Sequence, residues 1–173
     1  MGTGSPGFLG GFFFSIRFAF SDAASVADAR AFVGLSSSVA VPTNVEANTL
    51  TNSIGVAQLS TDTSQLYIVY GGSAAQTAIP LGGNFPPMNG TGATNGVLYD
   101  FTLFSPPNQN SVVYYSLERV GTSFSATGTL GPDTSVTLPT NTTLLAPRFW
   151  RCNNTTALAV GIDVVSIYVE TDY

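Results

Sequence analysis

The sequence of 173 residues contains no lysine, no histidine and one cysteine, and only 9% of its residues are charged. Without histidine it lacks a Ser-His-Asp or Cys-His unit and an HExxH zinc helix. Without lysine it lacks a Walker A loop and a Schiff base, so the glycine-rich segment 82–96 is expected to be a surface loop. A single cysteine excludes an intrachain disulfide, and we expect Cys152 to be a small buried residue. We therefore expect no enzyme and no cofactor.

The charge balance excludes further classes of function. Five arginines against ten acidic residues give a net charge of -5, which argues against a nucleic-acid footprint. The apolar segment Phe8–Phe20 contains Arg17, follows no basic region and is too short to span a bilayer, so we expect neither a signal peptide nor membrane insertion. With so few charges, hydroxyl and amide side chains or subunit contacts must cover the surface.

Strand signals recur about every ten residues, and helix signals are almost absent. Phenylalanine and isoleucine alternate with other residues from Phe12 to Phe20, which is typical of a strand. One helical turn is expected within Ser21–Arg30, capped by Ser21 or Asp22. The further expected strands are 31–35, 54–59, 65–70, 77–81 at an edge because of Pro80, 97–104, 112–120, 122–130 and 134–138. The pattern predicts an all-β fold, a β-sandwich of jelly-roll type, as a single domain over 12–173 after a flexible lead-in over 1–11.

The segment Ala157–Val169 is apolar on both of its strand faces. One face holds Leu158, Val160, Ile162 and Val164, and the other holds Val165, Ile167 and Val169. A strand of this kind must be covered on both sides by a second sheet or another copy of the chain. We expect a central strand with a bulge at Gly161–Asp163. We also expect Val165, Ile167 and Val169 to form the interface of a homotrimer.

Two segments are candidates for binding. The irregular loop 82–96 offers a variable contact surface, because binding residues lie on loops carried by rigid scaffolds. Its candidate contact residues are Asn84, Phe85, Asn89, Thr91 and Asn95. Trp150, beside Asn153 and Asn154, is suited to stack on a sugar, but tryptophan also caps cores and fills subunit contacts, and composition favours that second interpretation. Trp150 is retained as a candidate receptor contact.

Acidic residues leave one enzymatic alternative. Asp100 and Glu118 lie on the expected hairpin of 97–104 and 112–120, where they would face each other as a glycosidase pair does. The alternative is that both face solvent, with Glu118 paired to Arg119 or Arg17. Glu170 and Asp172 near the end of the chain are more simply solvated than metal-bound, and we expect no metal.

Four phrases carry a resemblance that covers about residues 30 to 173. They are RAFVGLSS (30–37), PTNVEANTLTNSIGVAQLSTDTSQLYIVYGG (42–72), LYDFTLFSPPN (98–108) and TLLAPRFWRCNNTTALAVGIDVVSIYVETDY (143–173). Together they resemble the C-terminal domains of tailed-bacteriophage fibre-like and other virion-surface proteins. The resemblance implies a trimeric β-rich knob on the virion surface that contacts other virion proteins and host surface glycans.

The function expected from this resemblance is that of a bacteriophage virion structural protein, a tail-fibre tip or spike used in host attachment. A capsid decoration or cementing protein that binds the head lattice is the alternative. A glycan-processing enzyme that uses Asp100 and Glu118 is the least favoured.

Overall fold

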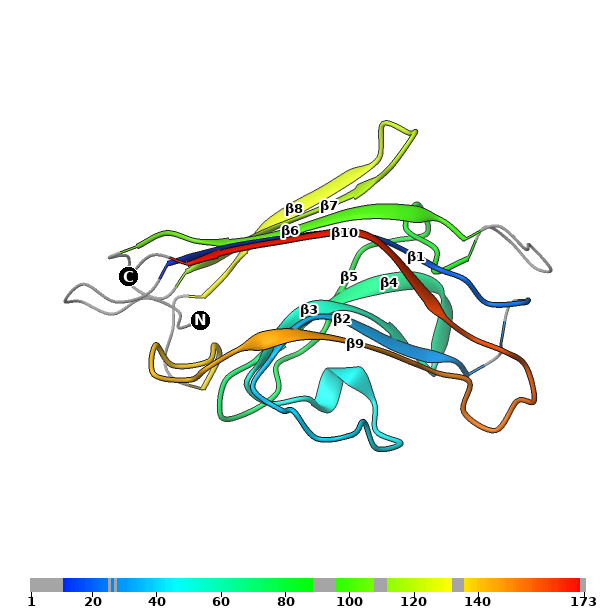
Figure 1. Cartoon of the computed structure of the whole chain (residues 1–173), viewed down its shortest axis with the longest axis horizontal. Helices are drawn as coiled ribbons and strands as arrows, with labels where there is room; N and C mark the ends of the chain where they lie inside the picture. Colours follow the sequence, from blue (N-terminus) through cyan, green and yellow to red (C-terminus); the bar gives the residue numbers. More distant parts are fainter. Residues whose placement is uncertain are drawn as a thin grey trace.

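The computed structural model describes residues 11–24, 26, 28–88, 96–107, 112–131 and 136–171. These residues form two antiparallel five-stranded sheets that pack face to face, so the predicted all-β class is confirmed (Figure 1). No helix among them is long and apolar enough to cross a membrane. The expected lead-in lies almost wholly outside the described residues.

The first sheet has the strand order β10-β1-β6-β7-β8. Its strands are β1 (Phe12–Phe20), β6 (Leu98–Ser105), β7 (Val113–Arg119), β8 (Ser125–Leu130) and β10 (Ile162–Thr171). The second sheet has the order β5-β4-β3-β2-β9. Its strands are β2 (Arg30–Ser36), β3 (Ser53–Leu59), β4 (Asp62–Gly71), β5 (Ile79–Pro80) and β9 (Ala146–Cys152), and the short 3-10 helix η1 (Ala47–Thr49) lies beside them.

Strand β1 shows how the sequence pattern produces the sandwich. Its alternate residues from Phe12 to Phe20 are buried against the second sheet, and the residues between them are only half-buried on the outer face. Because side chains alternate between the faces of a strand, one run of five large apolar residues supplies much of the main core. The aromatic rings of β1 meet Tyr99 and Phe101 of β6 inside this core. The prediction for Phe12–Phe20 is confirmed.

A second, smaller core lies on the outer face of the second sheet. Phe32, Ala57, Val69 and Trp150 pack there with Ala47 of η1. Strands β2 and β3 are therefore buried on both faces, which explains why their sequences are nearly continuous in apolar and small residues. The segment that carries η1 thus forms a third layer over part of the second sheet.

The position of β10 corrects one prediction. The C-terminal strand is an edge strand that pairs only with β1 among the described residues, and it is not central (Figure 1). The regular strand begins at Ile162, so the expected residues Leu158 and Val160 precede it. The apolar composition indicated burial, but it could not distinguish a central strand from an edge strand that lacks a cover.

A β-bulge changes which apolar side chains share a face. The pairing of β1 with β10 shifts between Arg17 and Phe18, so that Arg17 lies opposite Ser166 and Phe18 lies opposite Val164. Val165 is the extra residue, and the bulge is not at Gly161–Asp163 as predicted. Directly paired residues project to the same side of a sheet. The inner face of β10 therefore carries Ile162, Val164, Ile167 and Val169, which the regular alternation had divided between two faces.

Other expectations were right in part. The predicted hairpins correspond to β3–β4 and β6–β7, and Pro80 lies in the edge strand β5 as expected. The described residues of Ser21–Arg30 form no helical turn, and Asp28 has a left-handed φ of 60°. Residues 136–138, the described part of the expected strand 134–138, form bends. Strand β9 was not predicted because its residues alternate poorly in hydrophobicity.

A buried ion pair joins the two sheets at one end of the sandwich. Arg151 of β9 donates to both carboxylate oxygens of Asp22, which follows β1, and to Oε1 of Gln58 at 2.7 Å. The two charged side chains are 2% and 0% exposed. The Arg151 guanidinium also lies 4.4 Å from the centroid of the Phe20 ring. Asp22 further accepts a hydrogen bond from the backbone N–H of Gly161 at 3.3 Å, which fixes the connection between β9 and β10.

We predict that Asp22→Asn lowers the free energy of unfolding by about 3–5 kcal/mol, because it leaves the Arg151 charge buried without a counter-charge. Asp100→Asn is the matched control, since the Arg17–Asp100 pair is 43% and 31% exposed and is weakened by solvent. Urea denaturation followed by circular dichroism measures both. An equal decrease in the free energy of unfolding of the two variants would contradict a special role of the buried pair in joining the sheets.

Candidate functional site

A cavity with a volume of about 740 Å³ lies beside strand β9. Three segments line it: Pro42–Asn44, Trp150–Asn154 and Leu158–Val160. Its volume is in the range of small-molecule sites, which are commonly about 300–1,000 Å³. The first segment belongs to the layer over the second sheet, and the third leads into β10.

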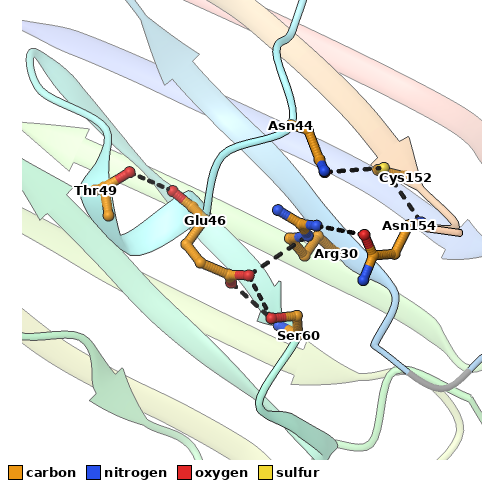
Figure 2. A network of polar contacts seen from close by, with 7 residues as sticks. All are labelled: Arg30, Asn44, Glu46, Thr49, Ser60, Cys152 and Asn154. Carbon is orange, nitrogen blue, oxygen red and sulfur yellow. Dashed lines mark hydrogen bonds and ion pairs between the residues drawn. The ribbon is translucent and has the colours of Figure 1, made fainter.

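A polar network beneath this cavity holds its first wall in place (Figure 2). Arg30 of β2 donates from Nη2 to Oδ1 of Asn154 at 2.8 Å, and its Nε lies 3.4 Å from Oε1 of Glu46. Glu46 also accepts hydrogen bonds from the backbone N–H of Ser60, at 3.1 Å, and from the Ser60 hydroxyl. The Arg30 side chain is 8% exposed, so Glu46 supplies the counter-charge that a buried guanidinium requires.

Three asparagines surround the cavity. Asn153 donates from Nδ2 to the carbonyl of Leu158 at 2.9 Å, which ties the connection between β9 and β10 into a compact turn. Asn154 adopts a left-handed φ of 55°, a conformation that asparagine tolerates better than most residues. Asn44 lies on the opposite wall, where its Oδ1 is 3.9 Å from Sγ of the half-buried Cys152. No sequence motif indicated Asn44, Arg30 or Glu46, because these residues meet only through the fold.

Trp150 belongs mainly to the smaller core. Its side chain is 8% exposed and its ring stacks on Phe32 with a centroid distance of 6.4 Å and an interplanar angle of 24°. This agrees with the interpretation of Trp150 as a core-capping residue. Its indole Nε1 is buried without a hydrogen-bond partner among the described residues, and the remaining exposed part of the residue lines the cavity. A receptor contact at Trp150 remains a prediction.

The loop that was expected to form a contact surface is only partly described. Asn84 is exposed, whereas Phe85 is 5% exposed and belongs to the main core, which corrects its assignment as a surface contact. The Phe85 ring stacks near Tyr99, whose hydroxyl donates to the Pro86 carbonyl at 2.6 Å. Burial raises the pKa of Tyr99, so this hydroxyl stays protonated and anchors the loop. Asn89, Thr91 and Asn95 lie outside the described residues.

The two carboxylates considered for catalysis lie opposite each other on β6 and β7, as predicted. Arg17 of β1 lies on the other side of Asp100 and donates to both of its oxygens, at 2.7 and 2.6 Å. Hydrogen bonding to Asp100 raises the pKa of Arg17. With Ser15, Thr102, Ser116 and Ser166 these residues line a polar depression of about 290 Å³ on the outer face of the first sheet. Asp100 is therefore engaged in an ion pair with Arg17.

The carboxylate of Glu170 accepts a hydrogen bond from the Tyr168 hydroxyl at 2.8 Å, which raises the pKa of that hydroxyl. Asp172, the other residue considered for an ion, lies outside the described residues. Among the residues that the structure describes, no three cysteine, aspartate or glutamate side chains gather at one place.

We predict that Glu46→Gln lowers the free energy of unfolding by about 2–3 kcal/mol, because it leaves Arg30 charged in a buried position. Hydrogen exchange is expected to increase in the segment around η1, and the emission of the single tryptophan, Trp150, is expected to shift to longer wavelength. Glu118→Gln is the control, because Glu118 is exposed. Unchanged exchange around η1 in Glu46→Gln would show that this network does not hold the cavity wall.

Comparison with known proteins gives little beyond the fold. No family model matches the chain, and no curated protein is similar to it. A solved structure of scytalido-glutamic peptidase with a transition state analog inhibitor is similar, with a TM-score of 0.49 and 11% identity over 94% of this chain and 79% of that chain. The expectation from the sequence that the chain is not an enzyme stays a prediction. A likeness at this level decides neither for nor against catalysis.

The expected bacteriophage role is corrected by these findings. The solved structure named above is a peptidase and not a virion protein, and no matching family or curated relative supports attachment, decoration of a capsid or glycan processing. The resemblance to virion-surface domains and the location on a virion remain predictions, because none of the comparisons bears on them.

Proposed function

We propose that the chain is a self-assembling β-sandwich whose copies associate through the inner face of β10. The observation that carries this proposal is the exposure of one apolar stripe, formed by Val164, Ile167 and Val169 with exposed fractions of 43%, 45% and 40%. These side chains point to the same side of the sheet as the buried residues of β1, but β10 lies at the edge, where the second sheet does not cover them.

A second copy of the chain is the occupant that fits this stripe. Contiguous exposed apolar surface on a folded domain marks an interaction site. The outer edge of β10 also has no strand partner among the described residues, so a neighbouring copy meets free backbone groups there as well. The five arginines of the chain are engaged with partners in the same subunit, which leaves the stripe without an adjacent free positive charge.

The arrangement of the exposed side chains favours a trimer over a dimer. Two β10 strands that paired edge to edge would extend the sheet but would leave the inner apolar faces in water. Packing of three stripes around a three-fold axis covers those faces with one another. Val165, the bulge residue, is 63% exposed and lies at the rim of such a contact.

The winding of the chain supports a sandwich of jelly-roll type. The terminal strands pair as nested partners, β1 with β10 and β2 with β9, so the two ends of the chain fold back on each other in both sheets. Such nesting places β9 and β10 at the edges on the same side of the sandwich (Figure 1). The apolar stripe therefore lies along this edge of the sandwich, and in the proposed assembly a neighbouring copy covers this edge.

We predict that the protein in solution has three times the mass of one chain, as measured by light scattering during gel filtration. Ile167→Ser is expected to dissociate the assembly at micromolar concentration, because it removes apolar area worth roughly 1–2 kcal/mol per copy from the contact. Val39→Ser is the control, since Val39 is 93% exposed and lies outside β10. A wild-type monomer at high micromolar concentration would refute the proposal, and a dimer would replace the trimer with a two-fold contact.

A further inference from the structure

The cavity beside β9 has the chemistry of a site for an uncharged ligand. Its lining contains one charged residue, Arg151, whose guanidinium is already bound by Asp22 and Gln58. Among the residues that the structure describes, no carboxylate lines it. A carboxylate or phosphate ligand would therefore lack a free cation to pair with, and a cationic ligand would lack an anion. A charged ligand of either sign would lose its hydration on entry, and no opposite charge in the cavity walls would compensate for that loss.

The polar groups around the cavity offer both donors and acceptors. Among the described residues, Nδ2 of Asn44, Oδ1 of Asn153 and Nδ2 of Asn154 have no hydrogen-bond partner, although the other amide atom of each side chain is engaged. These hydrogen bonds orient the side chains of Asn153 and Asn154 before any ligand arrives. Figure 2 shows Asn44 and Asn154 beside the Cys152 sulfur, which contacts Oδ1 of Asn44 and the backbone N–H of Asn154. The Asn154 side chain itself is turned toward Arg30.

Apolar surface accompanies these amides. Pro42, Leu158 and Val160 line the same cavity, together with the exposed part of Trp150. A ligand that fits must therefore present hydroxyl groups that both donate and accept, and also an apolar face. A pyranose ring has both features, with hydroxyls at its rim and C–H groups on its faces. We propose that this cavity binds a neutral saccharide.

The position of the site explains why it stays open. The network of Arg30 and Glu46 holds one wall, and the hydrogen bonds from Gly161 to Asp22 and from Asn153 to Leu158 hold the other. Both walls are fixed to opposite sides of β9, so a ligand enters a largely preformed site and pays little ordering entropy. The proposal does not depend on assembly, because the cavity lining does not include β10.

The chain provides its own probe for this site, because Trp150 is its single tryptophan and lines the cavity. Fluorescence titration and calorimetry of the whole chain would use glucose, galactose, N-acetylglucosamine and their disaccharides. Glucuronate and glucosamine serve as charged counterparts. We expect a saturable response to at least one neutral sugar and much weaker binding of the two charged ones. No saturable binding of any neutral sugar by either method would overturn the proposal, as would equally tight binding of the charged sugars.

The matched variants are Asn44→Ala and Asn84→Ala, two exposed asparagines of which only the first lines the cavity. Loss of one hydrogen bond to the sugar is expected to raise the Kd by about three- to tenfold in Asn44→Ala, with no change in Asn84→Ala. Thermal unfolding of both variants checks that the fold is retained. Equal affinities in wild type and Asn44→Ala would place the sugar elsewhere and refute this site.

Discussion

The buried pair of Arg151 and Asp22 is the interaction on which the end of the molecule with the cavity depends. Arg151 belongs to the second sheet and Asp22 follows the first strand of the other sheet, so the pair connects the two layers through buried charges. Two charges removed from water need good geometry and additional hydrogen bonds to be tolerated. Gln58, the Phe20 ring and the N–H of Gly161 provide them.

This pair also determines the path of the chain between β9 and β10. Besides the bond from Gly161, the backbone N–H groups of Ser21 and Ala23 donate to the carbonyls of Gly161 and Ala159, at 3.0 and 3.1 Å. The connection is thereby fastened to the segment that follows β1. This connection forms one wall of the cavity and leads into β10 at the edge of the first sheet. The cavity and the apolar stripe therefore share one structural support, although they lie in different places.

The sequence predicted the fold class and most strands because the alternation in β1 and the two main hairpins is strong and local. It did not predict the place of β10, because edge and central positions depend on which distant strands pair, and an apolar run is compatible with both. Because of the bulge at Val165, the residues after it project to the opposite face from the one that regular alternation predicts. No residue type at this position indicates a bulge. The candidate site was found only in part: Trp150 and the two neighbouring asparagines were noticed, whereas Asn44, Arg30 and Glu46 come together through tertiary structure.

The pairing of all five arginines within the chain affects how this protein binds other molecules. Each of the five donates to a carboxylate or a carbonyl of its own chain, as with Arg148 and the carbonyls of Ser38 and Ala40. The rest of the surface is rich in hydroxyl, amide and apolar groups, and the chain has a net charge of -5. Paired arginines attract an anionic partner only weakly, so such a partner gains little from long-range electrostatic steering. For an uncharged partner, we expect recognition to vary little with salt concentration and to depend on shape at short range.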